Sequence, residues 1–254
     1  MKVIEDTNLS YSWARAVRAA LGRHREIAPL VVSVTGSFED GMPPVDPELE
    51  RKLNALLRAE SGKLSIDTVA NTLFPQSLWN AGQPRKELFD RFLRLWPKIR
   101  KSNQHGHYFH RLITLGDPAV CNGNQLDFII GAYTERTGVR RSMLQATTFD
   151  AKTDHTKAAL RGFPCLQQVS FAVQRDKTLT VNGFYAYQYM GQRAYGNYLG
   201  LCRLGHFVAH ELGTTLGRMT CYAGIAHCDI GTTKLRGVLS HLDEGIFEGD
   251  DDGF

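Results

Sequence analysis

The stretch from residue 198 to residue 212 constrains the fold of this chain more than any other part of the sequence. At helical spacing, apolar side chains cover most of its circumference and leave no polar face for water. Small residues at Gly196, Gly200 and Gly205 permit close approach of a neighbouring backbone. The sequence therefore predicts a helix that is buried within the fold. The apolar residues are Tyr198, Leu199, Leu201, Leu204, Phe207, Val208 and Leu212.

Strand patterns lie on both sides of this helix in the sequence. Residues 166–173 and 178–189 precede it and are rich in β-branched and aromatic side chains, and a third strand follows it and ends near His227. Together with helices, these strands indicate an α/β (α+β) fold in which a mixed β-sheet is flanked by helices. The other predicted extended segments are 30–34, 108–113 and 140–149.

Helical patterns occupy most of the first half of the chain. Asp46 and Pro47 form an N-cap and first-turn signal, after which leucines at helical spacing continue until Gly62. Pro97 is expected to end a later helix, and Gly138 to close another. The remaining predicted helices cover residues 10–21, 66–73, 86–96 and 125–137.

Composition predicts one globular domain spanning 1–254, because the 254 residues are 43% hydrophobic and 22% charged. No apolar run reaches the roughly 18 residues of a membrane span, and the acidic N-terminus does not fit a signal peptide. The five cysteines form an odd number without zinc-ligand spacing, so reduced thiols and a cytoplasmic location are expected. A net charge of +4 suits an anionic small substrate and is too small to predict nucleic-acid binding.

Cys165 is the candidate nucleophile. It follows Pro164 at the start of a predicted strand, and Arg161 stands shortly before it. A nearby positive charge lowers the pKa of a thiol and favours the reactive thiolate. The alternative is a core thiol, because free cysteine is among the most buried residue types. Asn197 likewise has two interpretations, as a polar group that contacts a ligand or as the cap of the following helix.

The order of these residues resembles the core of the thymidylate synthases, in which a Pro-Cys nucleophile opens a strand and an asparagine starts a long buried helix. The resemblance rests on Pro164-Cys165, Asn197, Gly217 and His227. It implies a thymidylate-synthase-like fold and a methyltransferase of nucleotide biosynthesis, in which the thiol attacks C6 of a uracil nucleotide. C5 then takes a one-carbon unit from 5,10-methylenetetrahydrofolate, and the enzyme is a homodimer that associates through the sheet face.

The same resemblance assigns roles to individual residues. Tyr108 corresponds to the catalytic tyrosine and is a candidate for proton transfer, and Asn197 reads the O4 and N3–H edge of the base. His227 bonds the ribose hydroxyl. Arg140 and Arg141 correspond to the arginine pair offered across the dimer interface to the substrate phosphate. Both assignments have an alternative. Two adjacent arginines are also typical of an exposed surface, and Tyr108 is equally compatible with an aromatic strand residue in the core.

The chain departs from the family pattern at several functional positions. Ala186 stands where the phosphate-binding arginine is expected, Tyr189 replaces the folate-contacting aspartate, and Asn71 lies near the place of the catalytic glutamate. The acidic end at 250–254 replaces an apolar C-terminal lid. These departures keep a second hypothesis open, a non-catalytic nucleotide-binding or sensing module on the same fold. A methyl and a hydroxymethyl product are equally compatible with the sequence.

Two groups of histidines are the candidate metal ligands. His206 and His210 stand four residues apart on one predicted helix, without a third ligand in sequence reach. His105, His107 and His110 equally suit the lining of a substrate cavity. We therefore predict no metal site. A papain-like cysteine hydrolase is the other enzyme class considered for Cys165, which carries no local signature of that class.

Overall fold

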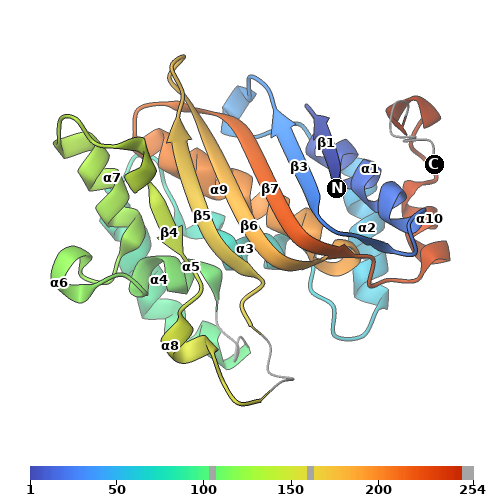
Figure 1. Cartoon of the computed structure of the whole chain (residues 1–254), viewed down its shortest axis with the longest axis horizontal. Coiled ribbons are helices and arrows are strands. Elements are labelled where there is room, and N and C mark those ends of the chain that lie inside the picture. Colours follow the sequence, from blue (N-terminus) through green and yellow to red (C-terminus); the bar gives the residue numbers. More distant parts are fainter. Residues whose placement is uncertain (103–106, 159–162, 248–254) are drawn as a thin grey trace.

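A seven-stranded mixed sheet forms the centre of the computed structural model, which describes residues 1–102, 107–158 and 163–247 (Figure 1). The strands are β1 Lys2–Asp6, β2 Glu26–Ile27, β3 Leu30–Thr35, β4 Gln145–Thr147, β5 Leu166–Val173, β6 Thr178–Tyr189 and β7 Thr215–His227. They lie in the order β1-β3-β7-β6-β5-β4, and β2 also pairs with β7. The β1–β3 and β6–β7 pairs are parallel, and the others are antiparallel. The predicted mixed sheet is confirmed.

Helices cover one face of this sheet, and the longest of them lies behind the strands in Figure 1. They are α1 Leu9–Leu21, α2 Pro47–Ala59, α3 Ile66–Leu73, α4 Arg85–Ile99, α5 Tyr108–Thr114, α6 Pro118–Cys121, α7 Gln125–Glu135, α8 Ala151–Asp154, α9 Tyr195–Glu211 and α10 Thr232–Leu239. Buried apolar side chains of the sheet and the helices form one continuous cluster. The described residues contain no helix that is long and apolar enough to cross a membrane.

Helix α9 is buried, as its sequence predicts, and its glycines are required by its neighbours. A Cβ atom on Gly200 would lie 2.8 Å from the Ala70 carbonyl oxygen of α3, and one on Gly205 would lie 2.7 Å from Val181 of β6. Any larger residue at these positions would push α3 or the sheet away. The glycines therefore allow α9 to sit between the sheet and α3.

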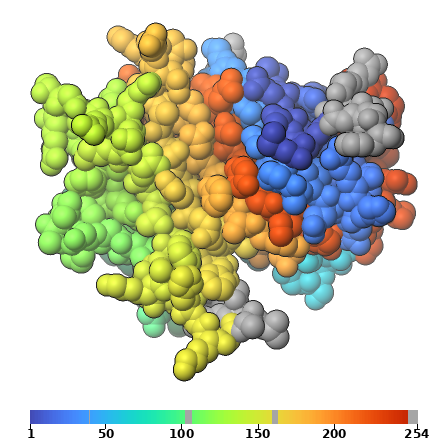
Figure 2. Space-filling model, in the orientation of Figure 1, coloured from blue at the N-terminus to red at the C-terminus, as the bar shows by residue number. Residues whose placement is uncertain are grey.

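On the opposite face of the sheet, no described helix lies over β5, β6 and β7 (Figures 1 and 2). Alternate residues of these strands point to it, as the period of two in a strand requires. Phe184 of β6 is 47% exposed there, and its ring stacks on Tyr222 of β7 with centroids 4.8 Å apart. A stacked aromatic pair with one exposed ring on an uncovered sheet face is typical of an interaction surface.

Three expectations about individual elements are wrong. Residues 108–113 form helix α5 rather than a strand, because Phe109, Leu112 and Ile113 are buried at helical spacing. Helix α4 continues through Pro97, which lies in its last turn, and ends at Ile99. The strand expected over 140–149 is shortened to β4, because residues 141–143 form a 3₁₀ turn.

Candidate active site

Cys165 lies at one end of the sheet, where β5 begins and β6 and β7 end. Its carbonyl oxygen accepts a hydrogen bond from the Ala186 backbone N–H at 2.9 Å, which joins the start of β5 to the end of β6. Further along β6, Tyr189 is the register partner of His227 on β7. The strand pairing therefore brings Cys165 and His227 to the same end of the sheet, although 62 residues separate them in the sequence.

The thiol of Cys165 is half-buried, and burial raises its pKa above the ordinary value. Arg193 acts in the opposite direction and lowers the pKa. The sequence predicts Arg161 as the cation at this thiol, and Arg161 lies outside the described residues. Among the described residues, Arg193 supplies the positive charge that acts on this thiol. The pKa of Cys165 is nevertheless raised, because the effect of burial is larger than that of Arg193.

Tyr108 packs beside Cys165. It is the first residue of helix α5, whereas the sequence predicted an extended segment at this position. Its hydroxyl oxygen accepts a hydrogen bond from the Leu166 backbone N–H at 3.5 Å, one residue after the cysteine. Burial and the neighbouring Cys165 raise the pKa of Tyr108. The phenol is therefore neutral near pH 7 and acts as a hydrogen-bond donor or acceptor rather than as a phenolate.

Arg193 belongs to a π-helix, η5 (Met190–Ala194), that links β6 to α9. The Asp229 carboxylate fixes the start of this turn, because its Oδ1 atom accepts from the backbone N–H groups of Gly191 at 2.9 Å and Gln192 at 3.3 Å. Lys63 lies 3.7 Å from the other oxygen of Asp229. Asp229 therefore holds the turn that carries Arg193.

The sequence pattern does not single out Arg193. Counting without gaps along the family pattern leads to Ala186, which lies on β6. The signal that could have found Arg193 is a basic residue between the end of a strand and the start of the buried helix.

Asn197 lies in the first turn of α9 and does not cap it, since the cap position is Ala194. The Asn197 side chain is almost completely buried and makes no hydrogen bond to another described residue. Helix α9 runs antiparallel to β6, because Gly205 packs on Val181 and Leu201 packs on Gly183.

Continuing this packing by one helical turn places Asn197 at the level of Tyr185. Tyr185 is the register partner of Leu166, the residue after Cys165. Asn197 therefore lies level with the start of β5, close along the sheet to Cys165.

His227 lies at the far side of the same strand ends. Its Nδ1 atom is 4.0 Å from the Glu26 carboxylate, and its ring centroid is 6.4 Å from that of Tyr187. Burial raises the pKa of the Tyr187 hydroxyl, and the neighbouring Tyr189 and Glu26 add to the shift. Tyr187 therefore lies beside His227 at these strand ends.

Arg140 and Arg141 are not brought to this site within one chain. Arg141 donates to the Val173 carbonyl oxygen at 3.0 Å, and Val173 is the last residue of β5. At about 3.3 Å per residue, the eight residues of β5 separate this end from Cys165 by more than 20 Å. Within one chain, Arg141 therefore lies at the other end of β5 from Cys165.

The described histidines do not form a metal centre. No group of three or more His, Cys, Asp or Glu side chains able to hold a metal ion occurs in the described part of the chain. His206 and His210 pack edge-on against Trp79, with centroids 5.3 Å and 5.5 Å away. Burial lowers the pKa of His107 to about 4, so its ring is neutral at pH 7. His105 lies outside the described residues.

Comparison with known proteins does not assign a role to this geometry. A scan against protein-family models and a search of curated proteins found no significant match to the chain. The function is therefore inferred from the gathered residues.

Proposed function

We propose that this chain is an enzyme of the thymidylate-synthase type, which adds the Cys165 thiol to C6 of a uracil nucleotide and so activates C5 for a one-carbon transfer. The observation that supports it is the hydrogen bond that joins Tyr108 to the start of β5, one residue after Cys165, where Arg193 also lowers the pKa of the thiol. A thiol supplies the nucleophile for such an addition, and a nearby cation favours its thiolate form.

The addition proceeds in balanced steps. The thiol loses its proton to solvent, and Arg193 stabilises the resulting thiolate. Sulfur then bonds to C6, and the C5=C6 electron pair moves towards O4 to form an enolate. C5 becomes nucleophilic and takes a proton from solvent. Loss of the original C5 hydrogen and departure of the thiolate restore the ring, so hydrogen at C5 exchanges with water.

Base recognition rests on Asn197. Its buried amide offers one donor and one acceptor, which match O4 and N3–H of uracil. Within the described part of the chain this amide makes no hydrogen bond, so a base is able to use both of its polar atoms. A uracil ring that lies between Asn197 and Cys165 satisfies the amide and exposes C6 to the thiol.

The residues fit the pyrimidine better than they fit the folate donor. Tyr189, at the position of the family's folate-contacting aspartate, is exposed, and the described contact of its ring is with Tyr187. Asn71, near the place of the catalytic glutamate, donates to Asp67 on the surface of α3. 5,10-Methylenetetrahydrofolate supplies a one-carbon unit when it is bound, whereas the addition to C6 depends on the chain's own residues.

A homodimer is part of the proposal. The uncovered sheet face with Phe184 and Tyr222 is the surface through which two copies are expected to pack. A twofold axis there makes it possible for Arg140 and Arg141 to reach the partner's nucleotide phosphate. The five free cysteines fit the reducing cytosol, where we expect the enzyme to act.

Release of tritium from [5-³H]dUMP and [5-³H]UMP tests the proposal, with and without methylenetetrahydrofolate. Wild-type protein is expected to release tritium slowly without the folate, and Cys165→Ser is expected to release none. Cys121→Ser, which alters the other half-buried thiol, is the matched control. Faster release on addition of the folate supports one-carbon transfer. Equal release by wild type and Cys165→Ser contradicts the proposed nucleophile.

A non-catalytic nucleotide-binding module is the second candidate. The raised pKa of Cys165 favours it, because little thiolate is present at neutral pH. In that case 5-fluoro-dUMP binds reversibly, no adduct is seen by intact mass, and Asn197 still discriminates between uracil and cytosine.

A further inference from the structure

Helix α1, near the start of the chain, places two polar side chains in the core. Ser10 and Trp13 stand three residues apart, so they project from the same face of the helix, and both are fully buried. A buried polar group needs a hydrogen-bond partner within the protein, because water does not reach it. The partners of these two residues lie at the two ends of the π-helix η5, 177 and 185 residues later in the sequence.

The Trp13 indole holds the start of η5. Its Nε1 atom donates to the carbonyl oxygen of Met190, the first residue of η5, at 2.8 Å, and this hydrogen bond is buried. The same ring packs edge-on against Tyr195, with centroids 5.7 Å apart. Tyr195 follows η5 directly as the first residue of α9. One side chain of α1 therefore contacts both ends of the turn that carries Arg193.

Ser10 holds the hydroxyl of Tyr195. Ser10 Oγ lies 2.7 Å from Tyr195 Oη, and the Tyr195 hydroxyl donates to Glu50 Oε1 at 3.1 Å. Because a phenol has one proton and Tyr195 gives it to Glu50, Ser10 is the donor to Tyr195. The Ser10 oxygen in turn accepts from the Asp46 backbone N–H at 2.7 Å. The first turn of α9 is thereby tied to α1 and to the start of α2.

These contacts decide where two residues of the candidate active site lie. Arg193 precedes Tyr195 by two residues in η5, and Asn197 follows it by two in the first turn of α9. Asp229 anchors the same turn from the end of β7. A shift of Met190 or Tyr195 would therefore move Arg193 and Asn197 relative to the start of β5.

We propose that Ser10 and Trp13 are positioning residues of the Cys165 site, which fix Arg193 and Asn197 by holding the two ends of η5. The inference deepens the proposed function, and it rests on that function for the role of Arg193 and Asn197 towards a nucleotide. Ser10 and Trp13 act through η5 and do not touch the substrate. A purely structural role would stabilise the fold without changing the reactivity of Cys165.

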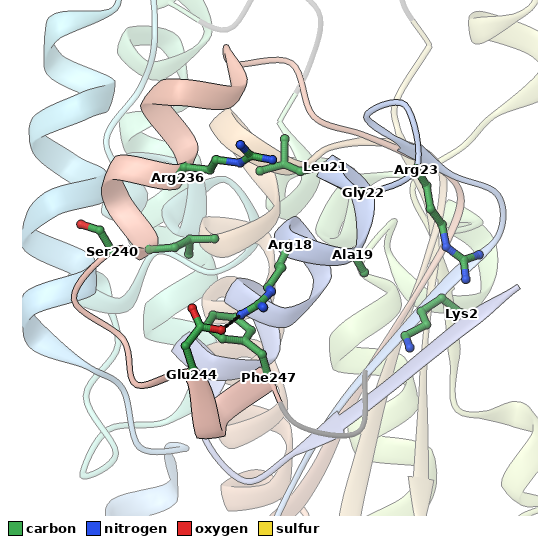
Figure 3. A pocket seen from close by; sticks show the side chains of 11 residues that line it. Lys2, Arg18, Ala19, Leu21, Gly22, Arg23, Arg236, Ser240, Glu244 and Phe247 are labelled. Carbon is green, nitrogen blue, oxygen red and sulfur yellow. Dashed lines mark hydrogen bonds and ion pairs between the residues drawn. The ribbon is translucent and has the colours of Figure 1, made fainter. Parts of the chain in front are cut away.

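The far end of α1 offers a matched control. There Arg18 Nη1 lies 2.6 Å from Glu244 of the 3₁₀ turn η6 (Glu244–Phe247), and its guanidinium carbon lies 4.2 Å from the centre of the Phe247 ring (Figure 3). The side chains of the ion pair are 44% and 82% exposed, and exposed pairs contribute little to stability. Arg18→Gln therefore removes a contact of the same helix without touching η5.

The pH dependence of iodoacetamide labelling of Cys165, in a Cys121→Ser background, tests the proposal. Trp13→Phe removes the indole N–H and keeps an aromatic ring, and Tyr195→Phe removes one hydroxyl. Both are expected to move the labelling curve to higher pH, because a displaced Arg193 no longer favours the thiolate. Labelling near pH 8 is then severalfold slower than in wild type. Arg18→Gln is expected to leave the curve unchanged.

A double-mutant comparison separates positioning from a general loss of stability. In an Arg193→Gln background, Trp13→Phe and Tyr195→Phe are expected to cause no further shift, because the group through which they act is gone. Val238→Ala removes buried methyl groups from α10 and controls for lost core packing, with thermal melting as the measure of stability. If Trp13→Phe does not fold, Tyr195→Phe decides alone.

Curves for the Phe variants that coincide with that of wild type would overturn the proposal, as would a full further shift in the Arg193→Gln background. The labelling needs no nucleotide, so its result is independent of the proposed reaction. Shifted curves in a protein that releases no tritium support the positioning and contradict the reaction. Tritium release together with unshifted curves contradicts the positioning alone.

Discussion

The Oδ1 atom of Asp229, just beyond β7, accepts a hydrogen bond of 2.9 Å from the backbone N–H of Gly191, at the start of the π-helix η5. This contact ties the end of one strand to the turn that carries Arg193. Gly191 is required there, since a Cβ atom would lie 2.8 Å from Ile230 and 3.1 Å from Asp229 Oδ1 itself. The position of the cation beside Cys165 therefore depends on a carboxylate from a distant part of the chain.

Asp229→Ala is expected to destabilise the protein by about 1–3 kcal/mol, because the N–H groups of Gly191 and Gln192 lose their acceptor. Asp229→Asn keeps an acceptor oxygen and is expected to recover most of this loss. Urea unfolding measures both variants. The control is Asp176→Ala, an exposed aspartate that accepts from the Thr178 N–H at 3.0 Å and is expected to cost less. Similar costs at positions 229 and 176 would show that Asp229 does not hold η5.

The alkylation rate of Cys165 is expected to rise with pH and to reach half its maximum above the ordinary thiol pKa, because burial raises the pKa and only the thiolate reacts. Arg193→Gln removes the group that lowers the pKa, so its curve is expected to lie at higher pH. Iodoacetamide labelling followed by mass spectrometry measures this in a Cys121→Ser background. Arg175→Gln, in the exposed turn before β6, serves as the charge control. Identical curves for wild type and Arg193→Gln would remove Arg193 from the site.

Asn197→Asp is expected to weaken uracil nucleotides about ten- to hundredfold and to improve cytosine nucleotides. A carboxylate only accepts hydrogen bonds, so it mismatches O4 of uracil and suits the amino group of cytosine. Titration of paired uridine and cytidine nucleotides against both variants makes the comparison. Asn182→Asp, on the open sheet face, controls for the added charge. Equal losses for both bases would mean that Asn197 does not contact the base.

Phe184→Glu is expected to convert a dimer into monomers, because it buries a charge at the centre of the uncovered sheet face. Sedimentation velocity measures the change. Leu93→Glu on α4 is the control, because Leu93 is a similarly exposed apolar residue at 42%.

Mixing and refolding Arg140→Ala with Cys165→Ser is further expected to restore some activity if the site is shared. A wild-type monomer would exclude any role for Arg140 and Arg141 at Cys165.

Much of the fold was predictable, because in most elements the spacing of apolar residues in the sequence agrees with the face that is buried in the structure. The helices at residues 10–21 and 66–73 and the strands β5 and β6 coincide with their sequence patterns. Local pattern failed where two periodicities compete over a short segment. In α5 the aromatic and β-branched residues that favoured a strand also have the helical spacing that buries Phe109 and Leu112, and packing selected the helix.

The sequence by itself determined the buried helix α9 and the strands on either side of it, and it proposed Cys165 and Asn197 as candidate site residues. Tertiary structure alone decided that Arg193 is the cation beside Cys165, that Asp229 holds its turn, and that Arg140 and Arg141 lie at the other end of β5. The physical reason is that periodicity reports which face of an element is buried. The neighbours of a side chain depend instead on strand register and on turns such as η5, which contacts from distant parts of the chain set.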